Sequence, residues 1–162
     1  ALSSAASDVY KRQVFFLGFA FTSIISRPVT GRLLDEFGGS VVVYPALIFL
    51  AAAMVLIGAA RSNGMLLSGA LVLGLGFATI TSACHALAVF VSPQKYVGRA
   101  TATYFVLLDV GVGIGPYTLG LLVPYFGFSA VYFAAAAVAA AGILIYWAVI
   151  GRTGIFLSLI HI

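Results

Sequence analysis

The chain has 162 residues, of which 63% are apolar and 7% are charged, whereas ordinary soluble domains contain about 45–50% apolar and about 25% charged residues. So few charged side chains cannot cover a water-soluble body of this size, which excludes a soluble globular protein and indicates an all-α, polytopic membrane protein. The net charge is +4. Cys84 is the only cysteine, which excludes a disulfide framework and a cysteine zinc site.

The two ends of the chain look foreign to the rest. Residues 8–13 read DVYKRQ and residues 157–162 read LSLIHI. One DNA element read in its two directions can encode both hexapeptides, and that element resembles a transposase mosaic end used to prepare sequencing libraries; residues 3–7 resemble translated adapter as well. Because such remnants are excluded from fold reasoning, we expect residues 1–13 and 157–162 to be adapter-derived. Residues 14–156 are then an internal piece of a longer gene.

Apolar runs, separated by short charged or glycine-bearing breaks, predict the membrane spans in chain order. A helix needs about 20 residues to cross about 30 Å of hydrocarbon, and a helix satisfies its backbone polar groups internally. One short run at the start is expected to be the truncated end of a helix, and four later runs are long enough to span. The truncated span is 14–25, and the complete spans are 41–60, 65–91, 100–123 and 129–150. We therefore expect about four and a half spans.

Basic residues in the short connections predict the orientation, because they accumulate on the cytoplasmic side of a membrane. Five of them share one side, and Arg61 lies alone on the other. The five are Arg27, Arg32, Lys95, Arg99 and Arg152. We expect residues 27–40, residues 92–99 and the end after residue 151 to face the cytoplasm at a plasma or inner cell membrane.

The stretch 26–40, SRPVTGRLLDEFGGS, is expected to be the first cytoplasmic loop. Gly31, Leu33, Asp35 and Gly38 match the G-x-L-x-D-x-x-G core between the second and third helices of each half of major facilitator superfamily transporters. The order of the later spans resembles one six-helix half of that family over nearly the whole chain. Because basic residues usual after the acid and after the second glycine are missing, the resemblance favours the C-terminal half.

The charges of this loop have two interpretations. Arg27, Arg32 and Asp35, together with Gly31 and Gly38, can form a conformational gating loop, whose charges pair with another helix end in one state and release it in another. The alternative is a solvated turn whose charges match the helix dipoles.

Asp109 lies ten residues into the span 100–123, far from either end. An acid at a helix centre costs about 2.5–3.5 kcal/mol on insertion scales, so it should face a bundle interior or a water-filled cavity. Two roles remain open, a carboxylate that couples proton movement to solute movement and a structural acid held by a hydroxyl or a basic partner. His85 is the second candidate for a proton or substrate pathway, with an interhelical hydrogen bond as its alternative.

Small residues and a proline mark the same span. Gly111 and Gly115 have the G-x-x-x-G spacing of closely packed membrane helices, and Gly120 lies five residues farther along. Pro116 lacks a backbone donor and predicts a kink. We expect these four residues to serve helix packing and bending.

The family resemblance implies secondary active transport of a small solute by alternating access, with proton-coupled efflux of a small organic compound as its specific form. The expected partners are the lipid bilayer, the solute, protons and the missing other half of the same transporter, and no nucleic acid. No catalytic residue, metal site or cofactor is expected. A membrane-embedded enzyme or a non-transporting scaffold is the alternative, but the three acids and one histidine of residues 14–156 offer no convincing catalytic set.

Overall fold

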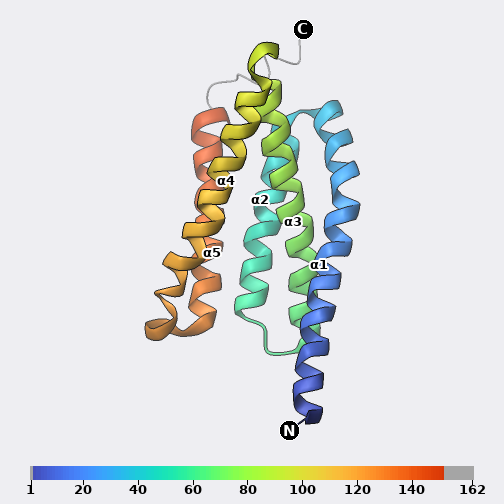
Figure 1. The fold of residues 1–162 in the computed structure, drawn as a ribbon, viewed down its shortest axis with the longest axis vertical. Coiled ribbons are helices and arrows are strands. Elements are labelled where there is room, and N and C mark those ends of the chain that lie inside the picture. The colour runs from blue at the N-terminus through green and yellow to red at the C-terminus, as the bar shows by residue number, and fades with distance from the viewer. Residues whose placement is uncertain (1, 152–162) are drawn as a thin grey trace.

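The computed structural model describes the backbone of residues 2–151 and the side chains of residues 9–149. Within this part, five long helices run alternately up and down (Figure 1). They are α1 Leu2–Phe37, α2 Gly39–Gly58, α3 Asn63–Phe90, α4 Val97–Gly120 and α5 Val123–Tyr146. A short 3-10 helix, η1 Gln94–Tyr96, precedes α4, and a π-helix, η2 Trp147–Gly151, follows α5. All five long helices are apolar and long enough to cross a membrane, which confirms the predicted all-α membrane bundle.

The first helix differs most from the prediction. The expected end of the first span at residue 25 and the expected loop 26–40 are both wrong, because α1 continues to Phe37. Five helices are long and apolar enough to span a membrane, and the truncation of the first one stays a prediction. The adapter origin of residues 2–13, which α1 also includes, stays a prediction.

Pro28 does not end α1, although a proline removes a backbone donor. Hydroxyl groups support the backbone on both sides of it: Thr30 Oγ1 donates to the Ser26 carbonyl at 2.8 Å, and Ser26 Oγ donates to the Ser23 carbonyl at 3.1 Å. The carbonyl that loses its helical donor at Pro28 is that of Ile24, and neither of these hydroxyl groups bonds it. The sequence pattern of charges and proline therefore looked like a loop but folds as helix.

Gly38 alone makes the connection between α1 and α2. Its φ is 80°, a backbone conformation that glycine adopts without the steric cost of a Cβ. Its N–H donates to the Leu34 carbonyl at 3.1 Å, which closes the last turn of α1. The chain thus turns a sharp corner and starts α2 at Gly39.

The remaining boundaries follow the apolar runs closely. α2, α3 and α4 begin and end within three residues of their predicted positions. Ser62 caps α3, because its side chain accepts a hydrogen bond from the Met65 N–H at 3.2 Å. α5 begins six residues before the predicted residue 129, and its backbone departs from helical geometry at Gly127, where φ is 76°.

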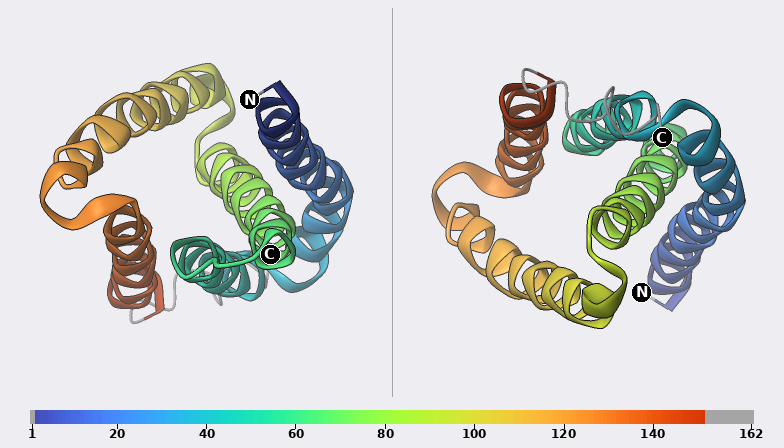
Figure 2. Two further views of the ribbon diagram at one scale, coloured as in Figure 1. Left: turned by 90° about the horizontal axis from the view of Figure 1, so that it is seen from below. Right: turned by 90° about the horizontal axis from the view of Figure 1, so that it is seen from above.

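Helices α1, α2 and α3 form the tightly packed part of the bundle, with α3 against both others and α5 on the far side of α2 (Figure 2). Buried side chains are small, and Val43 is the largest that is fully buried. Such residues let membrane helices approach closely, where van der Waals contact drives association. The central cluster contains Val42, Val43 and Ala83.

Three glycines of α3 mark the closest helix approaches. A Cβ at Gly76 would lie 2.6 Å from the Leu50 backbone nitrogen of α2, and one at Gly69 would lie 2.7 Å from Ile57 Cγ1. A Cβ at Gly74 would meet the Thr22 hydroxyl and would lie 2.5 Å from the Phe19 carbonyl oxygen of α1. Only glycine fits at these contacts.

The glycines of α4 have no packing partner in the described part of the chain. A Cβ at Gly111, Gly115 or Gly120 would meet nothing within 4 Å, so their role in helix packing stays a prediction. α4 also stays helical through Pro116 to Gly120. Non-helical backbone lies instead at Gly127 in α5.

The connections alternate between the two ends of the bundle. The α1–α2 corner and the α3–α4 connection lie at one end, and the α2–α3 and α4–α5 connections lie at the other (Figure 1). Arg61 is therefore at the opposite end from Lys95 and Arg99, as the sequence predicts. Arg152 and residues 157–162 lie outside the described residues.

Candidate functional site

A pocket of about 240 Å³ lies between α1, α3 and α4, lined by residues from the second half of α3 and the first half of α4. It brings together two predicted site residues, Arg27 of α1 and His85 of α3. Its lining consists of Arg27, Phe77, Thr81, Ser82, His85, Tyr104, Phe105 and Leu108. Aromatic rings and hydroxyl groups thus surround a single formally charged side chain, that of Arg27.

His85 sits among aromatic rings. Its ring centroid is 5.3 Å from that of Tyr104, with 30° between the planes, and 5.3 Å from that of Phe105. The Nε2 atom is buried and has no hydrogen-bond partner among the described residues. A buried polar atom without a partner is costly, so the position of His85 Nε2 destabilises the described part of the chain as it stands.

Tyr104 of α4 forms a hydrogen bond with α3 beside this pocket. Its hydroxyl group donates a hydrogen bond to the Thr81 carbonyl at 2.7 Å. Sequence reasoning did not single out Tyr104 or Phe77 as pocket residues, because facing residues on separate helices have no fixed spacing in sequence. The adjacent aromatic pair Tyr104 and Phe105, opposite the polar end of α3, was the available signal.

Arg27 is exposed along the pocket and forms no ion pair with a carboxylate of the described chain. Arginine is always charged and presents a planar fork of donors that matches carboxylate groups. Its charge is thus available to a ligand or to another segment of the protein.

Asp109 lies one residue beyond Leu108, the last pocket residue on α4. The structure does not enclose it: Asp109 is exposed, and no described residue of α4 is buried. It shares a helix face with Phe105, four residues before it, and so stands one turn from the pocket. Its role in proton coupling stays a prediction.

The predicted gating residues lie at the end of α1 and not in a loop. Arg32 and Asp35 are exposed, a Cβ at Gly31 would meet nothing within 4 Å, and Gly38 forms the corner. Arg27 alone among them reaches the pocket.

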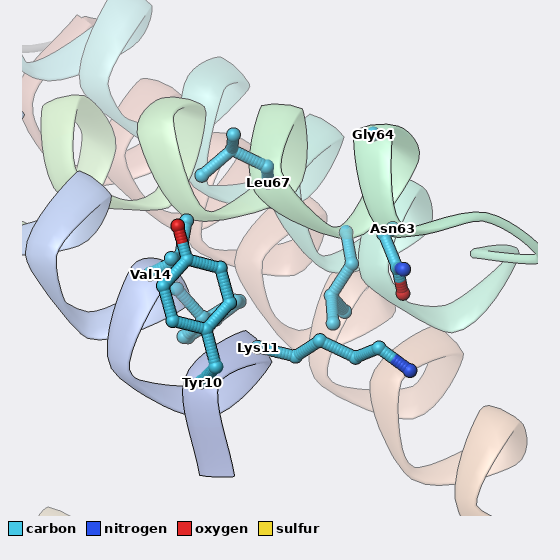
Figure 3. A pocket seen from close by; sticks show the side chains of 8 residues that line it. Tyr10, Lys11, Val14, Asn63, Gly64 and Leu67 are labelled. Atoms are coloured by element: carbon cyan, nitrogen blue, oxygen red, sulfur yellow. The ribbon is translucent and has the colours of Figure 1, made fainter. Parts of the chain in front are cut away.

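A second pocket, of about 380 Å³, lies at the opposite end of the bundle between the starts of α1 and α3. Figure 3 shows Tyr10, Lys11 and Val14 of α1 facing Asn63 and Leu67 of α3. Because Tyr10 and Lys11 belong to the stretch expected to be adapter-derived, this pocket carries no functional argument. Among the residues that the structure describes, no three His, Cys, Asp or Glu side chains gather where they could hold a metal ion.

Comparison with known proteins extends the resemblance seen in the sequence. The family profile described as Major Facilitator Superfamily matches residues 11–155. The uncharacterized MFS-type transporter YhhS of Escherichia coli strain K12 is 34% identical over 94 residues, and so is YhhS of Shigella flexneri. YhhS of Salmonella typhimurium is 33% identical over 94 residues.

These matches cover 58% of this chain and 23% of each relative, so the aligned segment spans about a quarter of the relatives' length. No solved structure gives a significant match.

Proposed function

The chain belongs to the major facilitator superfamily, and from that premise we propose that it forms part of a transporter that moves a small solute across a membrane by alternating access. The match over residues 11–155 carries this proposal. The five apolar helices and the pocket between α1, α3 and α4 support it. Membership of a transporter family disfavours the alternative of a membrane-embedded enzyme. The described residues around the pocket also include no nucleophile hydrogen-bonded to a base.

In this proposal α4 faces the other half of the transporter. An exposed acid in a membrane helix is expensive where it meets lipid, and Asp109 is exposed on a helix without buried residues. Protein or water must therefore cover that face in the complete transporter. We propose that the other half of the transporter packs against this face of α4, since in alternating access two halves rock about a site between them.

Asp109 is the proposed coupling group. A carboxylate at the boundary between two halves meets different surroundings in the two states, so it can take up a proton in one state and release it in the other. In the resulting cycle, protons move inward down their gradient and drive export of the solute. His85, one helix away at the pocket, is the second proton candidate.

The proposed orientation places the α1–α2 corner and the α3–α4 connection in the cytoplasm of a plasma or inner cell membrane. Arg27, Arg32, Lys95 and Arg99 lie toward that end, whereas Arg61 lies at the other. In a Cys84→Ser background, a cysteine at Ser62 should react with an impermeant maleimide added to intact cells. A cysteine at Ser92 should react only after permeabilisation, and the reverse pattern would overturn the orientation.

Reconstitution of the complete gene product in proteoliposomes tests transport itself. With a proton gradient imposed, a panel of labelled small organic solutes should include at least one that accumulates, and collapse of the gradient by an ionophore should abolish the accumulation. Protein-free liposomes give the background. Chemical turnover of a solute without flux would support the enzyme, and neither flux nor turnover would support a scaffold.

A further inference from the structure

The pocket between α1, α3 and α4 has a chemistry that defines a ligand class. We infer that it binds a small organic anion with one aromatic ring, the carboxylate on Arg27 and the ring among Phe77, His85 and Phe105. This inference rests on the proposed transport function and names the substrate class of that transporter.

The charge of the pocket favours an anionic ligand. Arg27 is its only formally charged lining residue, and no carboxylate is among the lining residues. Arg27 also forms no ion pair within the described chain. A guanidinium group forms bidentate, charge-assisted hydrogen bonds with a carboxylate, so an anion is favoured and a cation is repelled.

Donors without partners extend the polar end of the site. The Ser82 hydroxyl makes no hydrogen bond with the described residues. The Thr81 and Tyr104 hydroxyl groups, in contrast, already donate to backbone carbonyls. Arg27 and Ser82 thus remain as donors for a ligand with several acceptor oxygens.

The aromatic side chains of the lining favour a ligand that carries an aromatic ring. Phe77 and Phe105 face the pocket with the ring of His85, which is tilted by 47° to that of Phe105. Aromatic side chains prefer offset or edge contacts with another ring. A volume of about 240 Å³ is below the roughly 300–1,000 Å³ of drug-sized sites, so a single ring fits better than a fused polycyclic drug.

Binding to the purified, complete transporter tests the inference with three probes of similar size: benzoate, neutral benzyl alcohol and cationic benzylamine. We expect benzoate to bind at least about tenfold more tightly than the other two, because only it forms charge-assisted hydrogen bonds with Arg27. Arg27→Gln should weaken benzoate binding by at least about tenfold, and Arg27→Lys should keep part of the affinity because it keeps the charge.

Arg61→Gln is the matched control, since it removes one arginine charge at the opposite end of the bundle and should leave benzoate affinity unchanged. Monodisperse elution and an unchanged thermal midpoint establish that each variant is folded. If Arg27→Gln does not fold, the ranking of the three probes on the parent protein and on Arg27→Lys decides. Equal or tighter binding of benzylamine, no measurable benzoate binding, or equal benzoate affinity in folded Arg27→Gln overturns the inference.

Flux measured on the same preparation separates the two proposals. Benzoate binding that depends on Arg27, without flux of benzoate or of any other solute, would support the anion site and contradict transport. Flux of other solutes by a protein that does not bind benzoate would support transport and contradict the anion site.

Discussion

The crossing of α3 with α1 and α2 contrasts with α4, although both regions are rich in glycine. On α3, Gly74 and Gly76 leave no space for a methyl group beside the neighbouring backbones. On α4, Gly111 and Gly115 have the G-x-x-x-G spacing of a packing motif, but open space surrounds them in the described chain. A glycine pattern therefore indicates where two helices can approach, and it does not say which segment approaches.

The polar contacts repeat this contrast. Ser23 Oγ donates to the Gly74 carbonyl at 3.3 Å, and Thr30 Oγ1 donates to Thr79 Oγ1 at 3.2 Å, so hydrogen bonds join α1 to α3 at two levels. α4 is joined to α3 at Tyr104. The described chain thus has more interhelical hydrogen bonds between α1 and α3 than between α3 and α4.

The largest expected effect is on stability, from Gly76→Leu in the complete transporter. A Cβ at this position would lie 2.6 Å from the Leu50 nitrogen, and because backbone cannot move aside as a flexible side chain can, overpacking should cost about 1–3 kcal/mol or more. The thermal midpoint and the monodisperse yield in detergent measure this loss.

Gly115→Leu is the matched control, because nothing lies within 4 Å of that position in the described chain. Full stability of this variant would mean that α4 packs loosely in the whole protein. A loss as large as that of Gly76→Leu would instead show that the other half packs against Gly115, and it would remove the contrast between the two regions.

Asp109→Asn should have the next largest effect, on coupling and not on folding. Asparagine keeps the volume and hydrogen-bonding capacity but removes the proton-binding group, so accumulation driven by a proton gradient should fall at least about tenfold while exchange without a gradient persists. Both are measured in proteoliposomes at several pH values.

Glu36→Gln, which removes a carboxylate at the exposed end of α1, should leave accumulation unchanged. Parental accumulation and pH dependence in Asp109→Asn would exclude Asp109 as the coupling carboxylate. Joint collapse of exchange and folded yield would identify a structural acid, since removing one member of a buried ion pair leaves its partner uncompensated.

Tyr104→Phe should have the smallest effect, because it removes one hydroxyl group and keeps the ring beside His85. Loss of its hydrogen bond to the Thr81 carbonyl should lower stability by about 0.5–1.5 kcal/mol. Denaturation of the purified transporter, with Tyr117→Phe on an exposed turn of α4 as control, measures the difference. Equal stability of both variants would show that this bond does not hold α4 to α3.

Composition and apolar run length determined the class of the protein and most of the helix boundaries. A lipid solvent requires long apolar helices, so the spans can be read locally, as they were for α2, α3 and α4. The alternation of connections follows from the number of spans, which is why the sequence placed Arg61 opposite Lys95 correctly.

Tertiary structure decided what local patterns left open. Pro28 and the charges of residues 26–37 looked like a loop, but α1 continues through them to Phe37, and only the positive φ of Gly38 makes the turn. The placement of Arg27 and His85 on one pocket, and the close packing at Gly74 but not at Gly115, depend on which faces of distant helices come together. Helix packing is a property of surfaces and not of spacing along one chain, so no local pattern specifies it.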